Sequence, residues 1–224
     1  MALDRSHIDE DMTQPDWHAW HQPYGDPDSA LSKRLRAVQE QIGRALDRCP
    51  AGPIQAISLC AGQGQDLLGV LAAHRRAADV TALLVEQDPR NVAAARGSVA
   101  AGGLAGRVTV AEADAARTEL YRDVVPADLV LVCGVLGNIS DTDVERTIGF
   151  CRQLCHPGGT VIWTRHRNPP DLVPAICGWF ERHGFEQVWL SGPAEPFGAG
   201  AHCLAAPTEP LRYPDRMFTF VRTA

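Results

Sequence analysis

The chain has 224 residues, 45% hydrophobic and 21% charged, which is enough to form a globular core and excludes a disordered or fibrous protein. Its formal net charge of −6 argues against a broad cationic surface for nucleic acid, and no apolar run is long enough to cross a membrane. The seven cysteines lack the dense spacing of a disulfide framework and the paired spacing of a zinc site. We therefore expect a cytoplasmic protein with reduced thiols, and no metal, membrane or nucleic-acid partner.

Residues 1–28 differ from the rest of the chain. They lack a periodic pattern, and residues 17–24 hold three large aromatic side chains and two histidines. We expect residues 1–28 to form an arm that folds over the site as a lid, although the same arm would also fit a contact on the sheet or on a second subunit. Its candidate residues are Trp17, Trp20 and Tyr24 for substrate contact and His21 for catalysis.

From residue 29 onward, the apolar residues alternate between helical and strand spacing. The predicted helices are 29–47, 65–74, 89–101, 141–154 and 171–183. The predicted strands are 54–59, 80–85, 108–112, 127–133, 160–164 and 185–190, with short β-like pieces at 202–205 and 217–221. This alternation predicts one α/β domain over residues 29–224, with a mostly parallel sheet and helices on both faces.

The strongest functional signal follows the first predicted strand. Gly62 and Gly64 there permit a tight turn that passes close to a ligand, although a plain turn also needs small residues. Glu86 ends the second strand, 22 residues after Gly64, and a right-handed βαβ unit brings it beside that turn. A carboxylate in this place can accept hydrogen bonds from ribose hydroxyls, or it can serve the following helix, a role that Asp88 fills more naturally.

Three later strands end in residues that we expect at the same edge of the sheet. Asp114 can serve as a hydrogen-bond acceptor for the amino group of adenine, or it can cap a loop. Asn138 offers a donor and an acceptor after the fourth strand, or caps the next helix. After the fifth strand, His166 fits a general base and Arg165 fits an anchor for a carboxylate or phosphate of the substrate. Both residues also fit a solvated loop end.

Taken in order, these motifs resemble those of class I S-adenosylmethionine-dependent methyltransferases, over about residues 54–221. The family's first motif lies over residues 58–64, its fourth-strand motif over residues 128–138, and its Pro-Gly-Gly over residues 157–159. The resemblance implies a Rossmann-like, doubly wound sheet of seven strands that binds S-adenosylmethionine. It also implies in-line methyl transfer to a small molecule, driven by positioning, with an optional general base.

The sequence departs from the family pattern at the first motif, where Ser58 replaces the usual acid and Cys60 replaces the first glycine. Recognition of the methionine ammonium is therefore expected to use backbone carbonyls near Cys60 and Cys133, with Asp66 nearby. The residues expected to bind the cofactor are Ser58, Cys60, Ala61, Gly62, Gly64, Asp66, Glu86, Gln87, Asp114, Ala115, Cys133 and Gly134. The catalytic candidates are His166, Asn138 and His21, and the substrate-binding candidates are Trp17, Trp20, Tyr24, Asn138 and Arg165.

Two other functions stay open. An NAD(P)-dependent oxidoreductase would need a third glycine where Leu67 stands, and Asp66 would repel the pyrophosphate. A non-catalytic module that binds the adenosyl cofactor fits the same fold, because a fold does not fix a function. Residues 192–214 are expected to help enclose the acceptor, for which a specialised metabolite is the candidate class. The sequence leaves open the identity of the acceptor, the acceptor atom and the oligomeric state.

Overall fold

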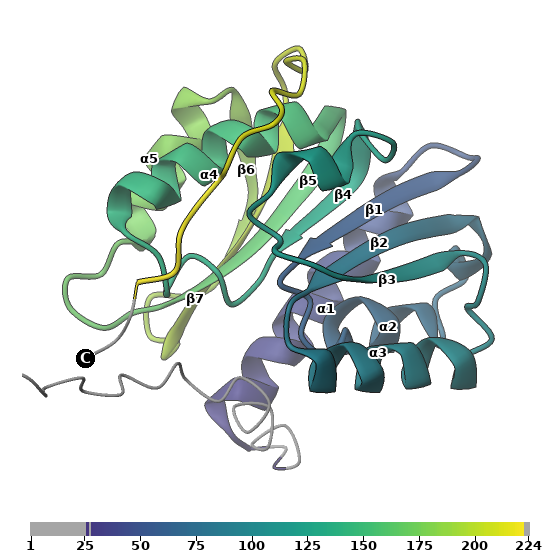
Figure 1. Cartoon of the computed structure of the whole chain (residues 1–224). Coiled ribbons are helices and arrows are strands. Elements are labelled where there is room, and N and C mark those ends of the chain that lie inside the picture. The colour runs from purple at the N-terminus through teal and green to yellow at the C-terminus, as the bar shows by residue number, and fades with distance from the viewer. Residues whose placement is uncertain (1–25, 27, 222–224) are drawn as a thin grey trace, which may run out of the picture.

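The computed structural model describes residue 26 and residues 28–221. They form a seven-stranded sheet with α1, α2 and α3 on one face and α4 and α5 on the other (Figure 1). The strands are β1 (Ile54–Leu59), β2 (Val80–Glu86), β3 (Val108–Glu112), β4 (Ala127–Val132), β5 (Cys155–His166), β6 (Phe185–Leu190) and β7 (Phe197–Leu204). The helices are α1 (Ala30–Arg48), α2 (Gln65–Leu71), α3 (Pro89–Ala101), α4 (Asp141–Leu154) and α5 (Val173–Arg182), with single 3-10 turns η2 (Ala77–Asp79) and η3 (Thr118–Tyr121).

The strand order is β3-β2-β1-β4-β5-β7-β6. All neighbouring strands are parallel except that β7 runs antiparallel to both β5 and β6. The predicted mostly parallel, seven-stranded α/β sheet is therefore confirmed. The chain reverses its direction of strand addition between β1 and β4, and ligands of open α/β sheets bind at the carboxyl ends of the strands at such a point.

Each face of the sheet has its own apolar core. In β1, Ile57 and Leu59 pack with the α4 and α5 side, whereas Ile54 and Ala56 pack with α1, α2 and α3. All four side chains are almost fully buried. A strand covered on both faces is apolar throughout rather than alternating, which is why the sequence of β1 reads as a continuous hydrophobic run.

The region around β7 differs from the predicted elements. The expected β-like piece at 202–205 is part of the eight-residue strand β7, which lies between β5 and β6. Residues 197–204 therefore belong to the sheet rather than to a loop, and the expectation that residues 192–214 help to enclose the acceptor stays a prediction. The small residues of β7 explain the difference, because a Cβ atom on Gly200 would lie 2.6 Å from the indole of Trp163. The glycine admits the large ring, and this pairing of distant residues leaves no periodic signal.

After β7, residues 206–221 run along α4 and back to the carboxyl edge of the sheet; we call this segment the C-terminal strap. The strap lies across the front of α4 in Figure 1. Its main chain bonds to the loop after β3, with Met217 N–H donating to the Ala116 carbonyl at 2.9 Å, and to the loop after β4, with Val221 N–H donating to the Asn138 carbonyl at 2.9 Å. The expected β-like piece at 217–221 is thus reduced to one isolated bridge, from Phe220 to Ile139, with a second bridge just before it from Arg216 to Arg117, because the strap pairs with loops rather than with a strand.

Candidate active site

The turn after β1 and the end of β2 form one connected unit. The backbone of Gly62 and Gly64 has φ values of 55° and 73°, a region that glycine adopts without strain. Glu86 is buried, and one of its carboxylate oxygens, Oε2, accepts the Gly62 N–H at 2.7 Å. The other, Oε1, accepts the backbone N–H groups of Gln87 at 3.0 Å and Asp88 at 2.8 Å. Backbone donors therefore fix this carboxylate beside the turn, as the βαβ argument predicts.

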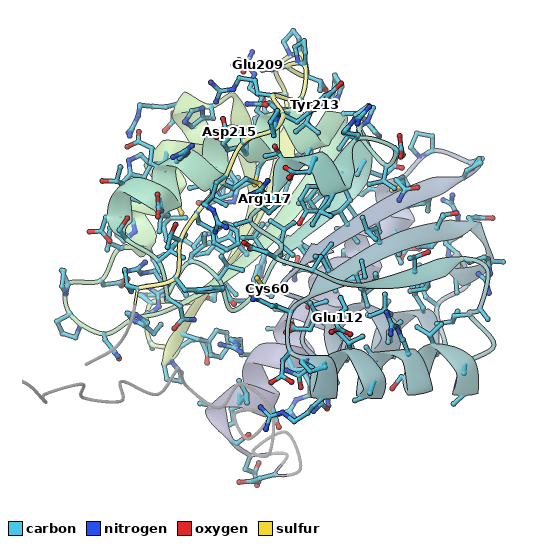
Figure 2. All side chains as sticks on the ribbon, viewed as in Figure 1. Cys60, Glu112, Arg117, Glu209, Tyr213 and Asp215 are labelled. Atoms are coloured by element: carbon cyan, nitrogen blue, oxygen red, sulfur yellow. The ribbon has the colours of Figure 1, made fainter. Side chains whose placement is uncertain are left out.

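Cys60, Glu86 and Asp114 gather at the ends of β1, β2 and β3. Burial, and then the negative charges of Glu86 and Asp114, raise the pKa of the Cys60 thiol, so Cys60 is a neutral thiol rather than a nucleophile. Asp114 Oδ1 accepts the Ala116 N–H at 3.0 Å, and Oδ2 accepts an N–H of Arg216 at 2.5 Å. Figure 2 labels Cys60 at the centre of this edge.

A second cluster joins the start of α2 to the end of β4. Asp66 Oδ1 accepts the Leu67 N–H at 2.8 Å, and burial raises the pKa of the Asp66 carboxyl group. Burial, and then the charge of Asp66, raises the pKa of Cys133, while Arg34 of α1 lowers it. The charge of Asp66 therefore acts on the end of β4, and its role toward a cationic group of the cofactor stays a prediction.

The loop after β4 is held from two sides. Gly134 has φ 76°, and a Cβ atom at this position would meet nothing within 4 Å, so open space lies over it. Its N–H donates to Thr164 Oγ1 of β5 at 2.9 Å. The Asn138 side-chain amide donates to the Gly134 carbonyl at 2.7 Å, so one end of Asn138 shapes the loop. Asn138 stays a candidate for ligand contact through its remaining acceptor.

The end of β5 carries the two candidates nearest to the loop after β4. His166 is exposed and lies against Gly137, where an added Cβ atom would be 3.0 Å from its ring. Its Nδ1 accepts the Asn168 N–H at 3.2 Å, which leaves the proton of a neutral ring on Nε2. Arg165 is only 8% exposed and donates to the Leu136 carbonyl, with the Asp141 carboxylate 3.7 Å away. Arg165 therefore supports the loop after β4, and its role toward a substrate stays a prediction.

The remaining candidates divide into three groups. Ala61 lies in the turn, its N–H bonded to the Val85 carbonyl, and Ala115 is buried beside Tyr121, whose hydroxyl donates to the Ala115 carbonyl at 2.7 Å. Ser58 is buried within β1, at the second-last position of the strand. The aromatic arm candidates Trp17, Trp20, His21 and Tyr24 lie outside the described residues.

Three site residues were missed by the sequence reasoning. Arg34, Thr164 and Arg216 contact or lie near the candidate residues although they are distant in sequence. Thr164 had a usable signal, because it lies at the carboxyl end of a strand on the same edge. Arg34 and Arg216 had none, since only the packing of α1 and of the strap brings them to the site.

Within residues 26 and 28–221, the structure shows no group of three His, Cys, Asp or Glu side chains arranged to hold a metal ion. The same residues include no helix with the length and apolar character of a membrane span. A groove of about 580 Å³ lies elsewhere, between α5 and β6, with Cys177, Glu181, Phe185 and His202 among its lining residues. It is separate from the carboxyl edge and shares no residue with it.

Comparison with known proteins establishes the fold. No protein-family model matches the chain, and no curated relative does either. An O-methyltransferase family protein from Burkholderia thailandensis is 18% identical with a TM-score of 0.59, covering 87% of this chain and 65% of that chain. Magnesium protoporphyrin IX methyltransferase from Synechocystis PCC 6803, with bound S-adenosylmethionine, is 12% identical with a TM-score of 0.63, covering 89% and 99%.

A third similar structure is precorrin-6y C5,15-methyltransferase from Geobacter metallireducens GS-15, at 16% identity and a TM-score of 0.56, covering 76% of this chain and 87% of that chain. The chain thus spans less than two thirds of the length of the Burkholderia protein and most of the length of the other two. The chain has the Rossmann-like fold of class I methyltransferases, as the resemblance of its motifs predicts.

Proposed function

We propose that this protein is an S-adenosylmethionine-dependent methyltransferase that acts on a small molecule. The observation that carries the proposal is Glu86, a buried carboxylate that backbone N–H groups fix beside the Gly62 turn. Three N–H donors occupy three of the about four acceptor sites of the carboxylate, so one site is left, on Oε2. A ribose hydroxyl can use that site without rearrangement of the turn.

The residues at the ends of β3 and β4, on the same edge of the sheet, fit the rest of the cofactor. Asp114 supplies an acceptor for an adenine amino group, and the open space over Gly134 admits a ligand close to the backbone. Asp66 supplies negative charge near Cys133, where a methionine ammonium would need it. When bound, S-adenosylmethionine supplies an electrophilic methyl group on a sulfonium.

The carboxylate of Asp66 argues against a dinucleotide cofactor. Asp66 lies in the first turn of α2, and its Oδ1 accepts the Leu67 N–H. In a dinucleotide-binding fold this turn receives a pyrophosphate, which a carboxylate repels. A sulfonium cofactor carries no phosphate, so Asp66 is compatible with it. This favours the methyltransferase over the oxidoreductase.

Methyl transfer is an in-line displacement, so the residues of this chain chiefly position the acceptor and exclude water. The Gly134 loop, tied to Thr164, fixes the floor of the site. A base is needed only if the acceptor carries a proton that it must lose. A neutral His166 carries its proton on Nε2, and the lone pair on Nδ1 already accepts the Asn168 N–H. To act as a base, His166 must break this hydrogen bond.

The first test is calorimetric titration of the full chain with S-adenosylhomocysteine, S-adenosylmethionine and NADH in parallel. The proposal expects micromolar binding of both adenosyl ligands and none of NADH. Binding of NADH alone would favour an oxidoreductase and overturn the proposal. Binding of no ligand would also count against it.

The second test measures transfer of a labelled methyl group from S-adenosylmethionine to a panel of small-molecule alcohols, phenols, amines and carbon acids. Product with any acceptor supports the enzyme; tight cofactor binding with no product across the panel favours a non-catalytic module. In an active enzyme, His166→Ala lowers turnover by about 10²–10⁴-fold if His166 is the base. Near-normal turnover of this variant removes His166 from the mechanism.

A further inference from the structure

The acid at the end of β3 already has a charged partner. Asp114 Oδ2 accepts an N–H of Arg216 at 2.5 Å, although 102 positions separate the two residues. Asp114 Oδ1 accepts the Ala116 N–H, so each carboxylate oxygen has one fixed donor. One lone pair on each oxygen is left for a ligand. The orientation of this carboxylate is therefore set partly by the strap.

Arg216 is itself held by the strap on both sides. Its other terminal nitrogen donates to the Phe218 carbonyl at 3.3 Å. Before it, Asp215 accepts an N–H of Arg146 of α4 at 2.8 Å, and the Asp215 carbonyl accepts the Thr118 N–H at 3.1 Å. After it, the side chains of Met217 and Phe218 are buried. Figure 2 shows Asp215 on the strap where the strap passes Arg117, in the loop after β3. The guanidinium group thus approaches Asp114 from a fixed backbone.

This ion pair is partly exposed, with 44% of the Arg216 side chain and 33% of the Asp114 side chain accessible. Exposed pairs of this kind contribute little to stability. Burial of Met217 and Phe218 and the main-chain bonds of the strap hold this part of the fold instead. The Asp114–Arg216 ion pair therefore acts on the candidate site, which contains Asp114, rather than on the stability of the fold.

We propose that Arg216 is a positioning residue that orients the Asp114 carboxylate to accept the 6-amino group of the cofactor's adenine, so that the strap sets base specificity. This inference rests on the proposed function. A carboxylate already held by Ala116 and Arg216 needs no further ordering when the ligand arrives, and such preorganisation converts directly into affinity. Without Arg216, Asp114 keeps one fixed donor and can rotate toward solvent.

The test compares two ligands on each variant. The first is S-adenosylhomocysteine, and the second is its analogue with hydrogen in place of the 6-amino group. The ratio of their dissociation constants isolates the contact of the amino group. In the unmodified chain we expect the amino ligand to bind about 10- to 100-fold more tightly, the usual range for a hydrogen bond to a charged group.

Arg216→Met keeps an unbranched apolar stem and removes the guanidinium group with its charge and donors. We expect this variant to lose at least about fivefold of the discrimination, and Arg216→Lys to keep most of it, because an ammonium can still donate to Asp114. Thermal unfolding should hardly change in either variant, as expected for an exposed ion pair. An unchanged or larger ratio in Arg216→Met would overturn the inference.

Two matched controls separate orientation from general damage. Arg117→Met removes a neighbouring arginine whose guanidinium group donates to Glu119, and which acts on Asp114 through its charge alone. Arg146→Met loosens the strap at Asp215 and leaves the Arg216 side chain in place. Both should keep the ligand ratio; a drop in both equal to that in Arg216→Met would assign the effect to the strap as a whole and contradict a specific role for Arg216. If the unmodified chain binds neither ligand, the proposed function itself fails, whereas normal binding with an insensitive ratio rejects only Arg216.

Discussion

The two halves of the sheet build their share of the site in different ways. In the half with β1, β2 and β3, Glu86 is fixed by backbone N–H groups of the adjoining turn and of the next two residues. In the half with β4 to β7, Gly134 needs Thr164 of the next strand. Asp114, at the end of β3, is the exception in the first half, because its charged partner Arg216 comes from the strap, 102 positions away. Glu86 is therefore fixed within one βαβ unit, whereas the loop after β4 and the Asp114 carboxylate depend on packing between distant segments.

This difference decides which part of the site depends on the packing of the whole domain. A carboxylate held by the turn of its own βαβ unit keeps its geometry wherever that unit forms. A carboxylate or loop held by a distant segment keeps its geometry only while the whole domain is packed. The four predictions below test the two halves against each other, in order of decreasing expected effect.

The largest effect is expected in the second half, at Gly200 of β7. A Cβ atom there would lie 2.6–2.7 Å from three atoms of the buried Trp163 indole. We expect Gly200→Ala to lower the free energy of unfolding by about 3 kcal/mol or more, because a rigid ring cannot yield in a packed core. Urea unfolding measures this change.

The matched control lies in the first half. Gly97 is in the interior of α3, and an added Cβ atom meets nothing within 4 Å. Gly97→Ala should therefore stabilise the protein by about 0.5–1 kcal/mol. Equal destabilisation by both substitutions would contradict the contrast between the halves.

The second prediction concerns acid and His202. Burial lowers the pKa of His202 from 6.5 to about 4. Trp163 Nε1–H donates to its Nδ1 at 3.1 Å, and the Phe180 ring stacks on it with the centroids 4.4 Å apart. Below pH 6.5 the unfolded chain binds a proton that the folded chain excludes until about pH 4. The free energy of unfolding should fall by about 3 kcal/mol across that window.

Urea unfolding at several pH values between 4 and 7 measures this loss. His202→Gln removes the titrating group, so its stability should lose this pH dependence, whatever its stability at neutral pH. An unmodified protein whose stability is flat from pH 6.5 to pH 4.5 would show that His202 is not responsible for an acid limit.

The third prediction concerns Glu86 in the first half. Glu86→Ala should weaken binding of S-adenosylhomocysteine by about 1–3 kcal/mol, because ribose hydroxyls lose a charged acceptor. Since Glu86 also fixes the turn, Glu86→Gln serves as a second variant that keeps the shape of the side chain. Calorimetric titration provides the measurement. The control is Glu112→Gln, which lies next to Glu86 in the register of β2 and β3 and should bind S-adenosylhomocysteine normally. Unchanged affinity in both Glu86 variants would contradict the placement of the ribose at Glu86.

The smallest effect is expected from His156 at the opposite edge of the sheet. Burial lowers the pKa of His156, but its hydrogen bonds to Asp128 Oδ1 at 2.6 Å and to the Pro157 carbonyl at 2.5 Å outweigh it and raise the pKa above 6.5. The folded state therefore holds this proton more tightly than the unfolded state. This stabilisation is complete below pH 6.5 and is lost as the pH rises through the folded pKa.

Unfolding curves above pH 6.5 measure the loss, and His156→Gln should remove it. Because the side chain is partly exposed, the change should be smaller than that of His202. Together the two histidines place the highest stability near pH 6.5. A rise in stability above neutral pH in the unmodified chain would contradict this assignment.

The predictable part of the fold follows from burial on both faces. The central parallel strands β1, β2, β4 and β5 could be predicted because each contains a mainly apolar run bounded by turn residues, and the edge strand β3 could be predicted from its alternating pattern. The full length of β7 was not, because its Gly198 and Gly200 weaken the strand pattern and their function is to admit side chains from other elements. The strap escaped prediction because its hydrogen bonds go to loops and to α4 rather than to a neighbouring strand.

The candidate site divides in the same way. Gly62, Gly64 and Glu86 could be placed together because a βαβ unit has only one common handedness. Asp114 could be placed at the edge but not given its partner, since nothing near Arg216 in the sequence signals an ion pair. Of the two alternatives for Arg165, a solvated loop end is wrong, because the side chain is buried and donates to the Leu136 carbonyl of the loop after β4. The role of Arg165 as an anion anchor stays a prediction.

The long separation between Asp114 and Arg216 also has a consequence during translation. At about 5–20 residues per second, Arg216 leaves the ribosome roughly 5–20 s after Asp114. During that interval a nascent chain can fold its first strands and the Glu86 turn, but the acid at the end of β3 has no guanidinium partner. The preorganised Asp114 carboxylate therefore becomes available to a ligand only after the strap has been synthesised and has packed, whereas the Glu86 carboxylate is in place earlier.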